Sequence, residues 1–313
     1  MELERKLKVA LDESRLLILG AQVLFGFQFE AAFQDEFKSL SAEARVIHGA
    51  GVVLLLATMA LLIAPSMHHQ IVYAGEARKG ALEAATGYAG SSLLPLTLGL
   101  GASAFMIFDH LFGRSAAIAI ATVLTLTGVG LLYGIGIVLK PTREDTSMPM
   151  EARATPLEVK IEQMLTEARV LIPGAQALLG FQFIATLTTS FQELPESLQL
   201  IHAGGLCAVT LAAMLLMTPA AVHRIAYGGE NDETFFRIGS VFIIAGAFPL
   251  ALGIAADIAV VFYKITESFG LSIGAGIASF ALLLAVWFGY PIWLRRTQTA
   301  AIATDQRQPI NIG

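Results

Sequence analysis

The sequence predicts an all-α, polytopic membrane protein with eight transmembrane helices, arranged as two four-helix repeats of the same orientation. The first observation is composition: 55% of the 313 residues are hydrophobic, 14% are charged, and the mean hydropathy is +0.68. The second is a series of apolar runs of about 20 residues, the length that crosses about 30 Å of hydrocarbon. The third is a duplication, because GAQVLFGFQF (20–29) returns as GAQALLGFQF (174–183) with eight of ten positions identical.

The duplication extends well beyond this segment. The same spacing of 154 residues pairs His48 with His202, Pro65 with Pro219, His69 with His223, Tyr73 with Tyr227, and Glu76 with Glu230. Between the third and fourth spans the spacing becomes 157 residues, where Phe112-Gly113-x-Ser115 matches Phe269-Gly270-x-Ser272. We therefore expect one unit, duplicated and fused. The expected organisation is a first repeat at 1–140, a cytoplasmic linker at 141–156, a second repeat at 157–296 and a cytoplasmic tail at 297–313.

The eight spans follow from the apolar runs. They are expected at 16–33, 46–67, 89–111 and 115–139 in the first repeat, and at 170–188, 199–221, 239–262 and 271–294 in the second. Each first span follows a lead-in with leucine or isoleucine every fourth residue, which predicts an amphipathic helix. Thr155-Pro156 supplies a helix start for the second lead-in, with a capping hydroxyl followed by proline in the first turn.

Lysine and arginine predict the topology. Sixteen of the twenty lie in the termini, the linker and the loops between the second and third spans of each repeat. Basic segments stay cytoplasmic, so both termini are expected there. Because each unit has four spans, an even number, the chain returns to its starting side after the first repeat. Both repeats are therefore expected to enter the membrane with the same orientation. A pseudo-two-fold axis along the membrane normal is then expected, as in parallel-repeat transporters.

Polar side chains inside the apolar spans are the candidate functional residues. Four amides recur in the duplicated segment, namely Gln22, Gln28, Gln176 and Gln182. They either join helices by hydrogen bonds or line a path for an ion or proton. Asp257 lies within the seventh span, where the first repeat has Ser103. A carboxylate at that depth costs several kcal/mol unless it is paired, protonated or hydrated. It is either a satisfied structural acid or an ion- and proton-binding group.

Two histidines bracket the second span of each repeat, which makes four in all. His48 and His202 are expected at the outer face, and His69 and His223 at the inner face. His48 and His69 lie about 31 Å apart along a helix and cannot share one metal ion. Each is instead placed to meet its repeat partner, which suits a proton relay or a bis-histidine haem. The alternative is an interfacial histidine bonded to loops or lipid headgroups.

The segment that follows each second span is also repeated. Pro65 to Glu76 contains proline, histidine, tyrosine and glutamate, and is either an inner gate or a fixed connector. Glu13 and Glu167 lie at the same face, just before the first span of each repeat. We expect them to pair with this segment as surface groups, which contribute little to stability.

Several classes of function are excluded by missing motifs. The chain has no P-loop, no zincin motif, no nucleophile elbow and one cysteine, Cys207. We therefore expect no enzyme, no metal site and no bound cofactor in the leading interpretation. Basic residues are too few for a nucleic-acid surface.

Two repeated motifs resemble a known family. These are G-x-Q-x-L-x-G-F-Q-F and the end of the second span, Ala64–Ile71 and Thr218–Ile225, which reads T/A-P-x-x-x-H-R/Q-I. They resemble a bacterial family of four-span integral membrane proteins of unknown function, whose members are sometimes labelled sodium:proton antiporter. The resemblance covers most of each half. Members typically have one unit, so the fused tandem is a departure.

The resemblance implies a multi-pass protein of the bacterial inner membrane that transports a small cation coupled to protons. Asp257 is then the ion or proton carboxylate, the amides line the path, and the histidines pass protons in and out. The expected partners are membrane lipid, the cation and the proton, and a homo-oligomer is compatible with the sequence. The alternatives are a b-type haem protein using the paired histidines and a non-catalytic membrane scaffold.

Overall fold

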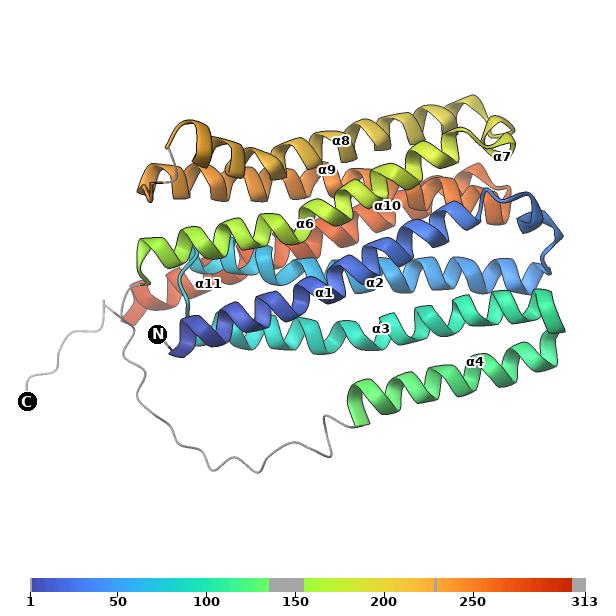
Figure 1. The fold of residues 1–313 in the computed structure, drawn as a ribbon, viewed down its shortest axis with the longest axis horizontal. Coiled ribbons are helices and arrows are strands. Elements are labelled where there is room, and N and C mark those ends of the chain that lie inside the picture. Colours follow the sequence, from blue (N-terminus) through green and yellow to red (C-terminus); the bar gives the residue numbers. More distant parts are fainter. Residues whose placement is uncertain (1, 135–154, 228–229, 306–313) are drawn as a thin grey trace, which may run out of the picture.

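The computed structural model describes residues 2–134, 155–227 and 230–305, and shows a bundle of long helices (Figure 1). The first half of the described chain contains α1 (Glu2–Ala31), η1 (Asp35–Ser39), α2 (Ala42–Tyr73), α3 (Lys79–Phe112), α4 (Arg114–Val129) and the π-helical turn η2 (Gly130–Gly134). The second half contains α6 (Leu157–Thr186), α7 (Thr189–Gln192), α8 (Glu196–Ile225), α9 (Glu233–Thr266), α10 (Phe269–Leu284), the π-helical turn η3 (Ala285–Gly289) and α11 (Tyr290–Asp305). These parts of the chain contain no strand.

Seven segments in the described residues are long and apolar enough to cross a membrane. They are α2, α3, α4 with η2, α6, α8, α9, and α10 continued through η3 into α11 as far as Gln298. The predicted all-helical membrane class is therefore confirmed. Helix α1, in which a charged first half and an apolar second half form one uninterrupted helix, is not among the seven. The end of the fourth predicted span (135–139), most of the predicted linker (141–154) and the end of the tail (306–313) lie outside the described residues.

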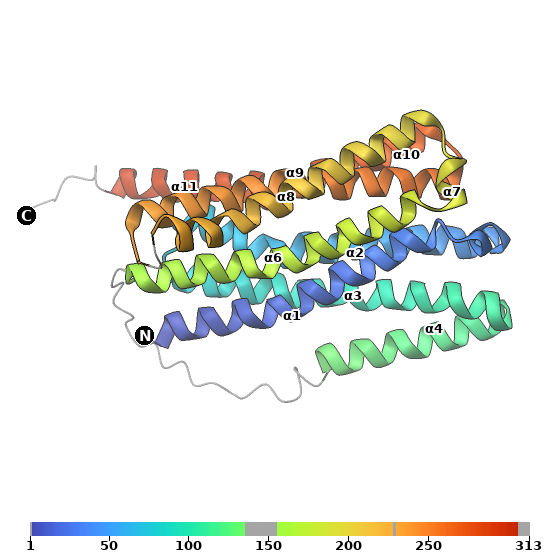
Figure 2. The same cartoon turned by 45° about the horizontal axis from the view of Figure 1, so that its top comes forward.

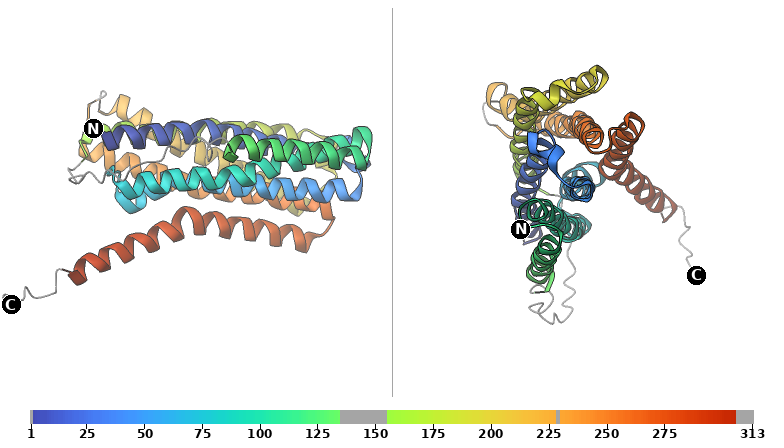
Figure 3. Two further views of the ribbon diagram at one scale, coloured as in Figure 1. Left: turned by 90° about the horizontal axis from the view of Figure 1, so that it is seen from below. Right: turned by 90° about the vertical axis from the view of Figure 1, so that its right-hand side faces the viewer.

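The long helices lie roughly side by side along one direction (Figures 1 and 2). Helices α1, α3, α6 and α9 run away from the end that holds the N-terminus, and α2, α4, α8 and α10–α11 run back toward it. Helices α1 and α6 are neighbours and pack against each other along one side of the bundle (Figure 3). Helix α2 contacts α1, α3 and α9, and also η3 and α11 near the C-terminus, so it joins the two halves.

The fourth helix of each half is placed differently. Helix α4 packs on α3, whereas α10 packs on α9, and η3 and α11 pack on α2 (Figure 3). Trp287 of η3 is fully buried, and its Nε1–H donates to the Ala60 carbonyl at 2.9 Å. At the spacing of 157 residues its counterpart is Gly130, which has no side chain to make this contact. Tryptophan therefore holds the last helices of the chain against α2.

The start of α6 differs from the sequence prediction. Pro156 is the N-cap residue, and Thr155 makes no capping hydrogen bond. Instead the Thr155 hydroxyl accepts from the Ala77 N–H at 2.9 Å, and the Thr155 N–H donates to Glu76 Oε2 at 3.0 Å. Lys160 Nζ also pairs with Glu76 at 2.5 Å. These contacts fix the beginning of the second half to the segment that follows α2.

Candidate functional site

Asp257 of α9 lies in the centre of a polar cluster within the second half. Its side chain is fully buried, and Gln182 Nε2 donates to Oδ1 at 3.0 Å and to Oδ2 at 2.9 Å. Gln182 comes from α6 and is also fully buried. Both residues were singled out in the sequence, and the structure brings them together. One amide group therefore binds both oxygens of a carboxylate that has no contact with water.

His202 of α8 is the third member of this cluster, which we call the outer site. Its Nε2 lies 3.1 Å from the Gln182 carbonyl and 3.2 Å from Thr186 Oγ1, and its Nδ1 lies 3.7 Å from Asp257 Oδ1. Since Thr186 Oγ1 already donates to the Gln182 carbonyl, the groups facing Nε2 are acceptors. Nε2 therefore carries a proton, and Nδ1 is the atom that faces the acid.

Aromatic rings cover the outer site. Phe29 of α1 stacks on the His202 ring with centroids 5.7 Å apart and an interplanar angle of 4°. Phe191 of α7 meets the same ring edge-on at 4.9 Å, and Phe33 lies between the two phenylalanines. Phe29 and Phe33 belong to the first half, so both halves close this end of the site.

The first half has an uncharged version of the same arrangement. Gln28 Nε2 donates to the hydroxyl of Ser103, which stands where the second half has Asp257. Ser103 in turn donates to the Gly99 carbonyl at 2.9 Å. His48 is buried against Phe37, and the backbone of Gln28 is a polar neighbour of its ring. The same helix positions therefore hold an amide and a histidine in both halves, but an acid in one.

A second buried acid lies near the other end of α6. Glu167 Oε1 lies 2.7 Å from His69 Nδ1, and Glu167 Oε2 accepts from Gln70 Nε2 at 2.6 Å. The Glu167 and His69 side chains are 1% and 2% exposed. The sequence predicted that Glu167 would pair with the segment starting at Pro65, and this contact is confirmed. The expectation of a surface pair is wrong, because α1, α2 and α6 enclose the acid.

The predicted cross-repeat histidine pairs do not form in the described residues. His69 is bonded to Glu167, and His223 stacks on Phe235 at 4.5 Å. No hydrogen bond or ring contact joins His48 to His202 or His69 to His223. The described residues also hold no cluster of three or more His, Cys, Asp or Glu side chains with the geometry of a metal site.

The four predicted amides have different surroundings. Gln28 and Gln182 each bind the third long helix of their own half. The Gln22 amide is buried against the backbone of Gly174, in the space that a Cβ would fill, and has no hydrogen bond among the described residues. Gln176 is exposed, and its amide lies 3.9 Å from the Met217 sulfur.

These features define a class: a multi-pass, all-helical membrane protein with buried carboxylates between its helices. A family model matches residues 1–135 and 150–291, which is more than half of the chain. The protein belongs to that family, which is described as a family of unknown function (DUF6328). The two matched regions correspond to the two predicted repeats, which is consistent with a duplicated unit. No curated protein and no solved structure matches the chain.

Proposed function

We propose that this protein is a secondary transporter that exchanges a small cation, such as sodium, for a proton at Asp257. The observation that carries the proposal is the outer site, in which a fully buried carboxylate has an amide donor and a histidine as its polar neighbours. An acid inside a membrane span is expensive unless its charge is neutralised, and such acids mark ion and proton pathways.

The charge states of the outer site support exchange. With one proton shared between Asp257 and His202, the pair has no net charge, either as carboxylate and imidazolium or as neutral acid and neutral imidazole. When that proton leaves, the site keeps one negative charge in an apolar surrounding. A monovalent cation at the carboxylate restores neutrality. Proton and cation therefore compete for one site, and that competition couples their movement.

The family resemblance and the charge distribution support the remaining parts of the proposal. Helix α1 acts as an eighth span, and its charged first half extends from the membrane. Both repeats have the same orientation, both termini are cytoplasmic, and the protein resides in a bacterial inner membrane. Its partners are lipid, the cation and the proton. It carries out no covalent chemistry, and a homo-oligomer is compatible with the exposed apolar helices.

The test is cation-driven proton movement in proteoliposomes. Purified protein is reconstituted in vesicles that contain a pH-sensitive dye, and sodium or potassium is added outside. Asp257→Asn keeps the size and the hydrogen-bonding capacity of the side chain but removes its titration. Glu83→Gln is the matched control, because Glu83 is an exposed acid on α3, the helix that corresponds to α9. Exchange by the wild type and Glu83→Gln, lost in Asp257→Asn, supports the proposal. Equal exchange in all three overturns it.

A further inference from the structure

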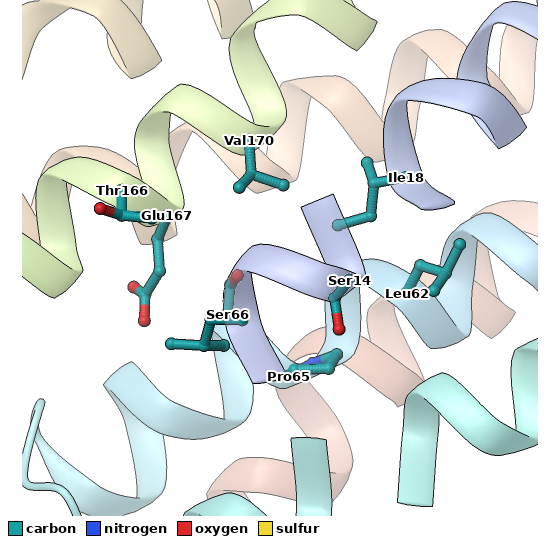
Figure 4. A pocket seen from close by; sticks show the side chains of 9 residues that line it. Ser14, Ile18, Leu62, Pro65, Ser66, Thr166, Glu167 and Val170 are labelled. Carbon is teal, nitrogen blue, oxygen red and sulfur yellow. The ribbon is translucent and has the colours of Figure 1, made fainter. Parts of the chain in front are cut away.

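The cluster of Glu167, His69 and Gln70, which we call the inner site, connects the two halves of the chain. Glu167 belongs to α6 in the second half, and its partners belong to α2 in the first. In Figure 4 the Glu167 carboxylate points from α6 toward α2, with Ser66 and Pro65 nearby on α2 and Ser14 on α1. Pro65 cannot donate a backbone hydrogen bond, so α2 has one unpaired carbonyl position in this region.

The inner and outer sites have the same chemical composition. In each, a buried carboxylate accepts a hydrogen bond from a glutamine Nε2 and faces a histidine Nδ1. Helix α6 contributes Glu167 to the inner site and Gln182 to the outer site. These residues are fifteen positions apart, which is about 22 Å along a helix. One helix therefore connects two acid–amide–imidazole clusters near opposite ends of its apolar part.

Hydrogen-bond accounting leaves the inner site without a single charge state in which every buried group is matched. His69 Nε2 is buried and has no hydrogen-bond partner among the described residues. A permanent imidazolium would need a partner for its Nε2–H. A neutral histidine that donates through Nδ1 would leave a buried negative charge on Glu167, with Gln70 as the other donor. Neither fixed state satisfies every group, and an unmatched buried charge or donor is costly.

Of the side chains that surround Glu167 in the described residues, His69 is the one that forms an ion pair with it. On α2 the neighbouring His68 packs against the rings of Tyr73, Tyr88 and Tyr290. On α1 the Ser14 hydroxyl donates to the Ala10 carbonyl, so it is already engaged.

On α6 itself, Thr166 and Gln163 adjoin Glu167 and are uncharged. The basic side chains Arg169 and Arg224 line a separate cavity with His223, on the side of α6 that faces α8. Proton exchange at the inner site therefore depends on Glu167 and His69 together.

The repeat does not supply a second copy of the inner site. The counterparts of Glu167, His69 and Gln70 are Glu13, His223 and Arg224. Glu13 is exposed on α1, and His223 stacks on Phe235. The inner site exists because α2 of one half meets α6 of the other, so the fused chain has one inner acid and one outer acid.

We propose that Glu167, with His69 and Gln70, is a second proton-binding site that takes up and releases one proton at the inner end of α6. In the protonated state the proton resides on a Glu167 oxygen that lies 2.7 Å from His69 Nδ1, and it leaves to water at that end. This inference rests on the proposed exchange function for its place in the transport cycle. Proton binding by Glu167 itself is tested separately.

The first measurement is infrared difference spectroscopy of the reconstituted protein between acidic and alkaline pH. A buried protonated carboxyl has a C=O stretching band that shifts in D2O. We expect two such bands, of which Glu167→Gln removes one and Asp257→Asn the other. Glu162→Gln is the matched control, because Glu162 is an exposed acid on the same helix that pairs with Lys8. His69→Gln keeps the acid, and we expect it to shift the Glu167 band, which a purely structural histidine would not do.

The second measurement is exchange in proteoliposomes. Glu167→Gln is expected to reduce steady-state exchange by about 100-fold, the lower range for a positioned proton-transfer group. Cation-induced proton release from the outer site in detergent should persist in this variant.

A carboxyl spectrum that is unchanged in Glu167→Gln overturns the inference, and so does wild-type exchange by that variant. If the wild type releases no proton on cation addition but the Glu167 band is present, the exchange function fails and the inner proton site stands.

Discussion

The two halves of this protein place the same amide and the same histidine at equivalent positions, but one half has an acid where the other has a serine. In the second half Gln182 binds both oxygens of Asp257, and in the first half Gln28 binds the Ser103 hydroxyl. The hydrogen-bonding scaffold is therefore common to both units, and the ability to carry charge is confined to one. The first half therefore has a counterpart of the outer site that is free of the cost of a buried acid.

Replacing the acid should remove this difference completely. Asp257→Ser gives both halves the same glutamine–serine pair, and we expect exchange in proteoliposomes to fall at least about 100-fold. The melting temperature should not fall, because the variant no longer buries a carboxylate. A variant that melts at the wild-type temperature and still exchanges would show that exchange does not depend on the outer site.

Adding an acid to the first half should sharpen the comparison. Ser103→Asp places a carboxylate beside Gln28, whose backbone is a polar neighbour of the buried His48 ring. Cation-induced proton release, measured with a pH dye in detergent, is expected to about double relative to wild type. Ser103→Asn is the control and should release the same amount as wild type. Unchanged release in Ser103→Asp would mean that the scaffold of the first half does not form a site.

The different packing of the fourth helices predicts a stability effect. Trp287→Ala removes a fully buried ring and its hydrogen bond to Ala60, at a cost of about 3 kcal/mol in unfolding free energy. Trp293→Ala is the control, because Trp293 is 59% exposed on the following helix and should change stability little. Denaturant titration in detergent measures both. Equal losses in the two variants would contradict the role of Trp287 in joining α2 to the last helices.

The smallest expected effect concerns the link between the halves at Glu76. Partial burial favours its neutral form, but hydrogen bonds from Lys160 and Thr155 outweigh this and lower the pKa of Glu76 below its ordinary value of 4.5. A carboxylate with a lowered pKa in the folded state stabilises the protein above pH 4.5, and this contribution is lost as the pH falls through the folded-state pKa.

Glu76→Gln should therefore lower stability by less than about 1 kcal/mol at neutral pH, because the pair is partly exposed to solvent. The difference from wild type should vanish in acid. Thermal melts at neutral and acidic pH measure it, with Glu83→Gln as the control. A difference that persists at the lowest pH would rule out this charge pair as its source.

The repeated spacing points to contacts within each half. Of the contacts between the halves, the sequence predicted that Glu167 meets the segment starting at Pro65, but not that this contact is buried. Gln182 and Asp257 are 75 residues apart, and so are Gln28 and Ser103. The repeated spacing therefore points to one internal contact that each unit makes. Glu167 with His69, and Trp287 with Ala60, depend on how two finished units pack. Membrane helices are apolar on every side, so the hydrophobic pattern does not indicate which face meets another helix.

The continuity of α1 followed from the sequence. A lead-in helix that runs into the first span was expected, and residues 2–31 form one helix. No proline or glycine pair lies near the expected boundary at residue 15 to interrupt it, so the helical hydrogen bonds continue. Thr155 was expected to cap its own helix, and it binds the segment after α2 instead. The local sequence therefore identified Thr155 as a hydrogen-bonding residue but predicted the wrong partner for it.

The contact between Trp287 and Ala60 also has a consequence for biogenesis. Helix α2 leaves the ribosome early, but the surface that Trp287 covers stays open until the last helices have been made. The nascent chain therefore passes through a stage in which α2 has to remain near the place where α10 and α11 will insert. The bundle is complete only when α2, which is made early, contacts η3, which is made late. A chain that stops before Trp287 would leave the surface of α2 around Ala60 exposed to lipid. Quality-control proteases of the membrane would then have access to it.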